Sequence, residues 1–130
     1  EQITNELDFS DVNMSAQNLV DICDTYEGIA IPAHPGRAGI GFAEYLDGGV
    51  TGFETVKSVE QLNGSNRPGE GEKAESLIKA KGYLGTGGSD AHIVSAIGTC
   101  MTSFEKTINN ESDLVQELRN GRFTAVRLES

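Results

Sequence analysis

The chain has 130 residues and a mass of 13.8 kDa, which is enough for one modest domain and too little for two. Hydrophobic residues make up 37% of the chain, which is enough for a small core. Because no run reaches about 18 apolar residues, we expect no membrane-spanning helix and no membrane partner. Twenty acidic and ten basic residues give a net charge of −10, which would repel a polyanion such as duplex DNA, so we expect no nucleic-acid partner.

Apolar periodicity and turn residues predict helices and strands that alternate along the chain. In chain order the expected elements are a helix over 15–26, a strand over 29–33, a short helix over 41–46, a strand over 50–56, a polar loop over 63–71, a helix over 74–81, a strand over 83–85, an extended segment over 97–101, a helix over 111–120 and a strand over 123–128. Ser15 and Asn110 are the expected N-caps of the first and last helices, and Gly28, Gly82 and Gly121 are expected to end helices, Gly28 in the left-handed conformation.

This alternation is typical of βα units around a mostly parallel sheet, so we expect an α/β fold of about three to four such units. The two cysteines, Cys23 and Cys100, are too few for a disulfide scaffold and have no CxxC spacing, which favours a reducing, cytoplasmic compartment. Both stand among apolar residues and have no histidine close by in sequence. We therefore expect both in the core, not as nucleophiles.

Four residues that suit metal or phosphate chemistry accompany the predicted strands. His34 comes directly after the first strand, Glu54 lies near the end of the second, and Asp90 and His92 follow the third. Because ligands bind beyond the C-terminal ends of parallel strands, we expect all four side chains at one rim. Imidazole and carboxylate together suit zinc, manganese or iron, and two residues of an extended segment that are two positions apart project to the same side.

Each candidate also has a purely structural interpretation, which the spacing leaves open. His34 suits a hydrogen-bonded turn before a proline, and Asp90 suits a capping role in a surface loop. Arg37 and Arg67 stand next to Pro-Gly turns, where an arginine either meets a phosphate or is simply exposed. Glu54 suits a solvated or substrate-side carboxylate better than a metal ligand.

Two segments resemble the third and fourth motifs of the polymerase and histidinol phosphatase (PHP) superfamily. They are AHPGR at 33–37 and GTGGSDAH at 85–92. GFE at 52–54 looks like the strand of that family that ends in Glu, and 114–126 resembles its closing helix and strand. The resemblance runs from about residue 15 to the end of the chain, with the two motifs in the family's order and spacing.

The resemblance implies a share of a distorted (β/α)7 barrel that holds up to three divalent ions (Zn, Mn, Fe or Mg) at its C-terminal rim. Carried over residue by residue, His34, Asp90 and His92 match metal ligands of the family. Arg37, Glu54 and Arg67 are the candidate substrate-binding residues at the same rim.

The chain departs from the family pattern in its histidine content. The first motif of the family, His-x-His, is absent, and a chain with two histidines cannot supply it. We therefore expect residues 1–130 to be the C-terminal portion of a single PHP-type domain, whose early barrel strands lie upstream. We expect the isolated chain to be inactive, to bind metal weakly and to self-associate through an unpaired sheet edge.

The resemblance predicts that the parent protein is a metal-dependent phosphoesterase, which hydrolyses a small phosphorylated metabolite with a metal-activated water. A first alternative is a non-catalytic PHP-like interaction or regulatory module, which keeps the barrel without its metals. A second is a nuclease or polymerase-associated PHP domain. Only 6% of the residues are aromatic, which leaves few platforms for base stacking and ranks the nuclease below the phosphoesterase.

Overall fold

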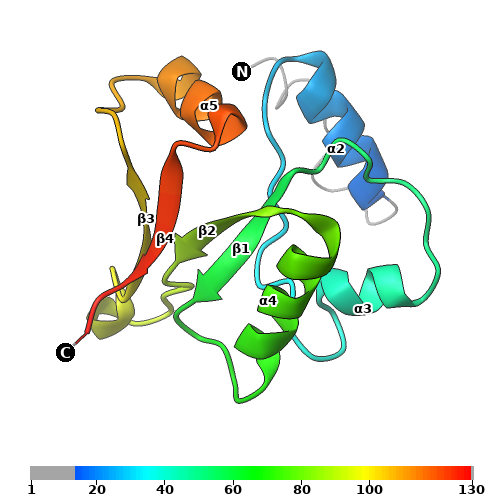
Figure 1. The fold of residues 1–130 in the computed structure, drawn as a ribbon, viewed down its shortest axis with the longest axis horizontal. Coiled ribbons are helices and arrows are strands. Elements are labelled where there is room, and N and C mark those ends of the chain that lie inside the picture. Colours follow the sequence, from blue (N-terminus) through cyan, green and yellow to red (C-terminus); the bar gives the residue numbers. More distant parts are fainter. Residues whose placement is uncertain (1–13, 130) are drawn as a thin grey trace.

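The computed structural model describes residues 14–129, and its fold is mixed α/β (Figure 1). Its elements in chain order are α2 (Ala16–Thr25), α3 (Phe42–Asp47), β1 (Ser58–Asn63), α4 (Glu70–Lys81), β2 (Leu84–Gly88), the 3₁₀ turn η1 (Val94–Ala96), β3 (Cys100–Phe104), α5 (Glu111–Asn120) and β4 (Phe123–Arg127). The strands form two small sheets, β1 with β2 and β3 with β4. The expected α/β class is confirmed at this level.

One parallel βαβ unit lies at the centre of the molecule. β1 and β2 pair in parallel, from Ser58 opposite Leu84 to Asn63 opposite Gly88, and α4 makes the crossover between them (Figure 1). The first turn of α4 carries two glutamates and its last turn two lysines, the charges that complement a helix dipole. The helix ends at Gly82, whose φ of 71° is left-handed as expected.

The second sheet is antiparallel, so the prediction of a mostly parallel sheet is only half right. Phe104 at the end of β3 faces Phe123 at the start of β4. The chain leaves the sheet at the end of β3, passes through α5 and enters β4 at the same end of the sheet. The two strands therefore run in opposite directions. The Thr102 hydroxyl joins this sheet to β2, because it accepts from the backbone N of Gly87 (3.0 Å) and donates to its carbonyl oxygen (2.9 Å).

Side-chain caps define the first and last helices as predicted. Ser15 accepts a hydrogen bond from the backbone N of Asn18, and Asn110 accepts one from that of Asp113. Gly121 ends α5 with a φ of 71°. The prediction for α2 is wrong in one detail, since its left-handed residue is Glu27, with a φ of 58°.

The strand predicted over 29–33 is not formed, although the segment runs beside β1. The carbonyl oxygen of Pro32 accepts a hydrogen bond from the backbone N of Glu60 (3.0 Å). Pro32 has no N–H of its own to return to a ladder. The segment is therefore attached to the edge of β1 without becoming a regular strand.

The strand predicted over 50–56 is also wrong, and the regular strand begins at Ser58 instead. Gly52 and Phe53 both have positive φ, of 117° and 59°, which breaks an extended run. The backbone N of Phe53 donates to Oε1 of Gln17 (2.8 Å), so this segment is held against α2. The apolar pattern reflects burial of a turn, not of a strand.

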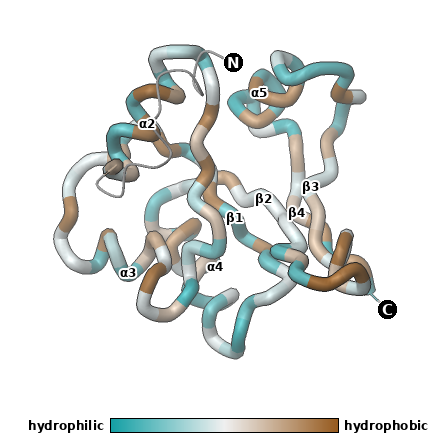
Figure 2. Tube along the Cα trace, turned by 180° about the vertical axis from the view of Figure 1, so that it is seen from behind, coloured by the Kyte–Doolittle hydropathy of each residue, from teal (hydrophilic) through white to brown (hydrophobic). Residues whose placement is uncertain are grey.

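The hydrophobic core lies between this turn, β1 and the helices around them. Its buried centre consists of Val20, Phe53, Val56 and Val59. The Phe53 ring makes edge-on contacts with two aromatic rings of α3, at centroid distances of 5.3 and 5.8 Å. Figure 2 shows the apolar stretches of the chain, including the loop between β2 and β3.

Both cysteines are free and buried, Cys23 in α2 and Cys100 in β3, as the sequence predicted. Burial raises the pKa of the Cys23 thiol, which makes it a poorer nucleophile. Within the described residues, no helix combines the length and the apolar character that a membrane crossing requires.

Candidate functional site

Two loops meet at the C-terminal ends of β1 and β2. Because these strands are parallel, both ends lie at one edge, where the backbone N of Gly64 donates to the carbonyl oxygen of Gly88 (3.0 Å). The Ser65 hydroxyl donates to the backbone oxygen of Asp90 (2.9 Å), which fixes the loop after β2 against the loop after β1. This edge is where the sequence placed a ligand site.

Arg37 connects the two loops to the start of α4. Its Nη2 donates to Oδ2 of Asp90 (3.0 Å) and to Oδ1 of Asn63 (3.4 Å). Its Nε lies 3.5 Å from Oε2 of Glu70, an ion-pair contact without a hydrogen bond. The side chains of Arg37 and Asp90 are only 21% and 22% exposed, so this contact is partly shielded from solvent.

The Arg37 hydrogen bond is the main cause of a lowered pKa at Asp90, with partial burial acting in the opposite direction. The ionised form of the Asp90 carboxyl is therefore favoured. The structure confirms that AHPGR and GSDAH come together, and Arg37 is the residue that joins them. Its substrate-binding role stays a prediction.

Glu60 and Asn63 on β1 belong to the same cluster and were missed in the sequence. Oε2 of Glu60 accepts from the backbone N of His34 (2.6 Å) and from Nδ2 of Asn63 (3.0 Å). Asn63 is 1% exposed, and its Oδ1 also accepts from the backbone N of Ser65 (2.8 Å). An Asn-Gly dipeptide is a turn signal, and the one at 63–64 could have marked the end of β1. It was not used because the strand was predicted over 50–56.

A second buried carboxylate, Glu70, fixes the chain around Arg37. It is 5% exposed and accepts hydrogen bonds from the backbone N of Arg67 (2.8 Å) and of Ala38 (3.1 Å). These two hydrogen bonds, in that order, lower its pKa, helped by the nearby charges of Arg37 and Arg67. Glu70 therefore ties the start of α4 to the turn that carries Arg37.

Both lowered carboxyl pKa values predict a loss of stability in acid. A group with a lowered pKa in the fold contributes stability above its unfolded pKa, about 3.9 for Asp and 4.3 for Glu, and loses it as pH falls through the folded value. We expect the urea midpoint to drop between about pH 5 and about pH 3, and to drop less in Glu70→Gln. Glu72→Gln removes a carboxylate from the exposed face of the same helix and controls for net charge. Equal acid sensitivity of Glu70→Gln and the wild type would contradict the prediction.

The two histidines differ in environment. His34 has a φ of 31°, its backbone N is held by Glu60, and its Nδ1 is buried with no hydrogen-bond partner in the described part of the chain. His92 is 80% exposed, and its Nδ1 lies 2.9 Å from the backbone oxygen of Asp90. Because that oxygen can only accept, neutral His92 carries its proton on Nδ1, which leaves the Nε2 lone pair free.

Strained backbone accompanies both loops. Four non-glycine residues of the described chain have positive φ, and two of them are His34 (31°) and Asp90 (48°). Such a conformation costs energy and persists where surrounding contacts hold it, as Glu60 and Arg37 do here. The other two, Glu27 and Phe53, lie in turns outside the cluster.

The fit to a metal ion is incomplete. The donor types of His34, Asp90 and His92 suit a divalent transition metal, and the buried Nδ1 of His34 lacks a partner. Yet across residues 14–129 no three His, Cys, Asp or Glu side chains form a group that could hold an ion, and Asp90 pairs with Arg37 instead. These residues do not constitute a complete metal centre by themselves.

Glu54 and Arg67 were both predicted at the rim, and the structure places only Arg67 after the end of a strand. Glu54 lies in an exposed turn before β1, at the opposite end of that strand from Asn63, so the prediction that it shares the rim is wrong. Its backbone oxygen accepts from Nζ of Lys57 (2.8 Å). Arg67 lies after the end of β1 with an exposed side chain, and its proposed contact with substrate stays a prediction.

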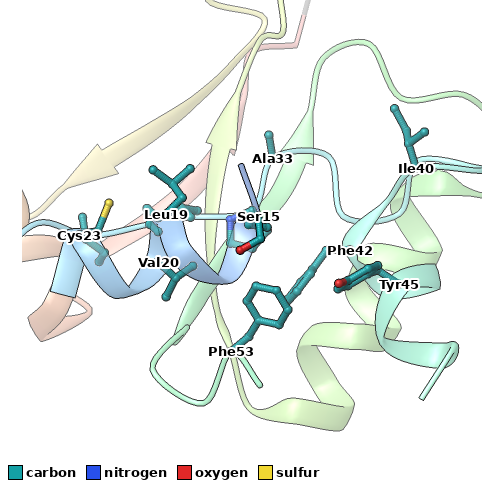
Figure 3. Close-up of a pocket in the computed structure, with 14 residues that line it drawn as sticks. Ser15, Leu19, Val20, Cys23, Ala33, Ile40, Phe42, Tyr45 and Phe53 are labelled. Atoms are coloured by element: carbon teal, nitrogen blue, oxygen red, sulfur yellow. The ribbon is translucent and has the colours of Figure 1, made fainter. Parts of the chain in front are cut away.

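An apolar groove lies away from this cluster, between α2, the 29–33 segment and α3 (Figure 3). It has a volume of about 670 Å³ and is lined by apolar side chains such as Leu19, Phe42 and Phe53. None of His34, Asp90 and His92 lines it. The groove is therefore separate from the polar side chains at the strand ends.

Comparison with known families adds one finding. Residues 68–123 match a family model described as PHP-associated. The match covers less than half of the chain and supports the C-terminal part of a PHP domain. This match confirms the resemblance seen in the sequence, and its range includes Asp90 and His92 but not His34 or Arg37. Searches of curated proteins and of solved structures found no significant match.

Proposed function

We propose that this chain is part of a metal-dependent phosphoesterase that hydrolyses a small phosphorylated metabolite. The observation that carries the proposal is the cluster at the ends of β1 and β2 in a chain that contains part of a PHP domain. There the contacts of Arg37 and Glu60 bring together the loops of His34 and Asp90. The family resemblance assigns metal binding to those two residues and to His92.

The charge of the cluster supports the need for a cation. Glu60, Glu70 and Asp90 provide three carboxylates, and within the described residues Arg37 is the one cationic side chain with an ion pair to any of them, to Glu70 and to Asp90. Such a surface repels a phosphate unless positive charge is added. Bound divalent ions would supply that charge and would acidify a bound water. The chain itself offers the Nε2 lone pair of His92, the carboxylate of Asp90 and the buried Nδ1 of His34.

We propose that the remaining ligands come from the rest of the same domain, arranged as a distorted (β/α)7 barrel. Three observations support this arrangement. The 29–33 segment lies beside β1 and β1 pairs with β2, so these three segments are neighbours in the order of the chain. The next strand, β3, is joined to β2 by the Thr102 side chain. The 29–33 segment carries one hydrogen bond to β1 and borders the apolar groove, so further strands could pair with it and cover that groove.

The test compares the 130-residue chain with a longer protein that also carries the preceding part of the domain. We expect the longer protein to hydrolyse an aryl phosphate when Mn²⁺ or Zn²⁺ is added, and the short chain to show neither turnover nor tight metal binding by calorimetry. A longer protein that binds less than one equivalent of metal and is inactive with every divalent ion would refute the proposal. Faster turnover of single-stranded DNA than of sugar or nucleoside phosphates would replace the metabolite by a nucleic acid.

The Arg37–Asp90 ion pair favours a second candidate, a non-catalytic PHP-like regulatory module. A guanidinium 3.0 Å from Asp90 neutralises that carboxylate without a metal. In such a module the pair is permanent and structural. Metal content of the longer protein separates the two candidates, since the phosphoesterase requires metal at Asp90 and the module does not.

A further inference from the structure

Glu60 is an unusual residue for its position in the sheet. It lies in β1, is half-buried, and takes part in no ion pair within residues 14–129. Partial burial of an unpaired carboxylate costs free energy of folding unless hydrogen bonds compensate for the lost hydration. The strand register also shifts directly after it, because Thr86 faces Glu60 while Gly87 faces Leu62. Irregular pairing of this kind re-aims side chains and is common beside functional sites.

The contacts of Glu60 lead to both loops of the site. One oxygen, Oε2, accepts from the backbone N of His34 and from the side chain of Asn63. Asn63 accepts from Arg37, which in turn donates to Asp90. The glycine at the end of β2 leaves room for the carboxylate, because a Cβ on Gly88 would overlap its Oε1.

We propose that Glu60 is a positioning residue, which holds the His34 turn directly and the Asp90 loop through Asn63 and Arg37. It keeps His34 in its left-handed conformation, which the residue would otherwise leave. This inference rests on the proposed function for the roles of His34 and Asp90, and on the contacts alone for the role of Glu60.

Hydrogen exchange at the His34 amide tests the contact directly in the 130-residue chain. In Glu60→Ala we expect this amide to exchange at least about tenfold faster, since a hydrogen bond to a charged acceptor is lost. In Glu60→Gln the amide oxygen can replace Oε2 and keep both hydrogen bonds, so exchange should stay within about threefold of the wild type. Glu72→Ala, on the exposed face of α4, is the matched control. Asn63→Asp is a second variant, which sets two carboxylates against each other and should also free the His34 amide.

Activity of the longer protein provides the second readout. We expect Glu60→Ala to lower kcat about tenfold or more, Glu60→Gln to restore most of it, and Glu72→Ala to leave it unchanged. Unchanged His34 exchange in both Glu60→Ala and Asn63→Asp would overturn the inference. If no protein, wild type included, hydrolyses phosphate esters, the proposed function fails, while the exchange result still decides whether Glu60 positions His34.

Discussion

Replacing Asp90 with Asn is expected to lower phosphate-ester turnover by the longer, metal-loaded protein about a hundredfold or more. Asn has the same shape and can still accept the hydrogen bond from Arg37, so the loop should keep its place. The negative charge is lost, and with it the attraction for a divalent cation. His92→Ala should have a similar effect, because it removes the free Nε2 lone pair.

Cys100→Ser is the control for these variants. Cys100 is 2% exposed in β3 and is placed here as a packing residue. We expect that variant to cost some stability and little turnover at a temperature where it stays folded. Turnover is measured with an aryl phosphate at saturating Mn²⁺. Equal turnover of Asp90→Asn and the wild type would eliminate Asp90 as a ligand.

Gly36→Ala is expected to destabilise the fold by about 3 kcal/mol. Gly36 is buried against the start of α4, where an added Cβ would overlap the carbonyl oxygen of Glu70 and approach the backbone N of Ala74 to 3.0 Å. Backbone atoms of a helix cannot move aside as a flexible side chain can. The turn that carries Arg37 would have to move away from α4, and the contact between Arg37 and Asp90 would be lost with it.

Gly71→Ala makes the same chemical change in the first turn of α4 and is the matched control. Its added Cβ would meet only the Asn66 side chain, at 3.7 Å. Because alanine favours a helix over glycine, we expect a gain of about 0.5 kcal/mol. Urea unfolding at pH 7 measures both variants. A Gly36→Ala protein as stable as the wild type would show that the close approach to α4 does not exist.

Local signals in the sequence predicted the helices well and the strands unevenly, since β4 (Phe123–Arg127) lies where a strand was expected and the strands expected over 29–33 and 50–56 are not formed. A cap depends on a few neighbouring residues, so Ser15, Asn110 and Gly121 were sufficient to place helix ends. A strand depends on a partner that is distant in sequence. Val50, Phe53 and Val56 gave an apolar run, but that run is buried as a turn against α2, and the strand pairing with β2 begins at Ser58.

The sequence by itself indicated the candidate motif residues His34, Asp90 and His92 and the PHP resemblance that the family match over residues 68–123 supports, because motif residues are read one by one along the chain. Only the tertiary structure decided that Glu60, not Glu54, contacts the cluster at the strand ends, and that Arg37 pairs with Asp90. Those contacts join residues 26 and 53 positions apart in sequence. They depend on strand register and on loop conformation, and neither is encoded in the spacing of a motif.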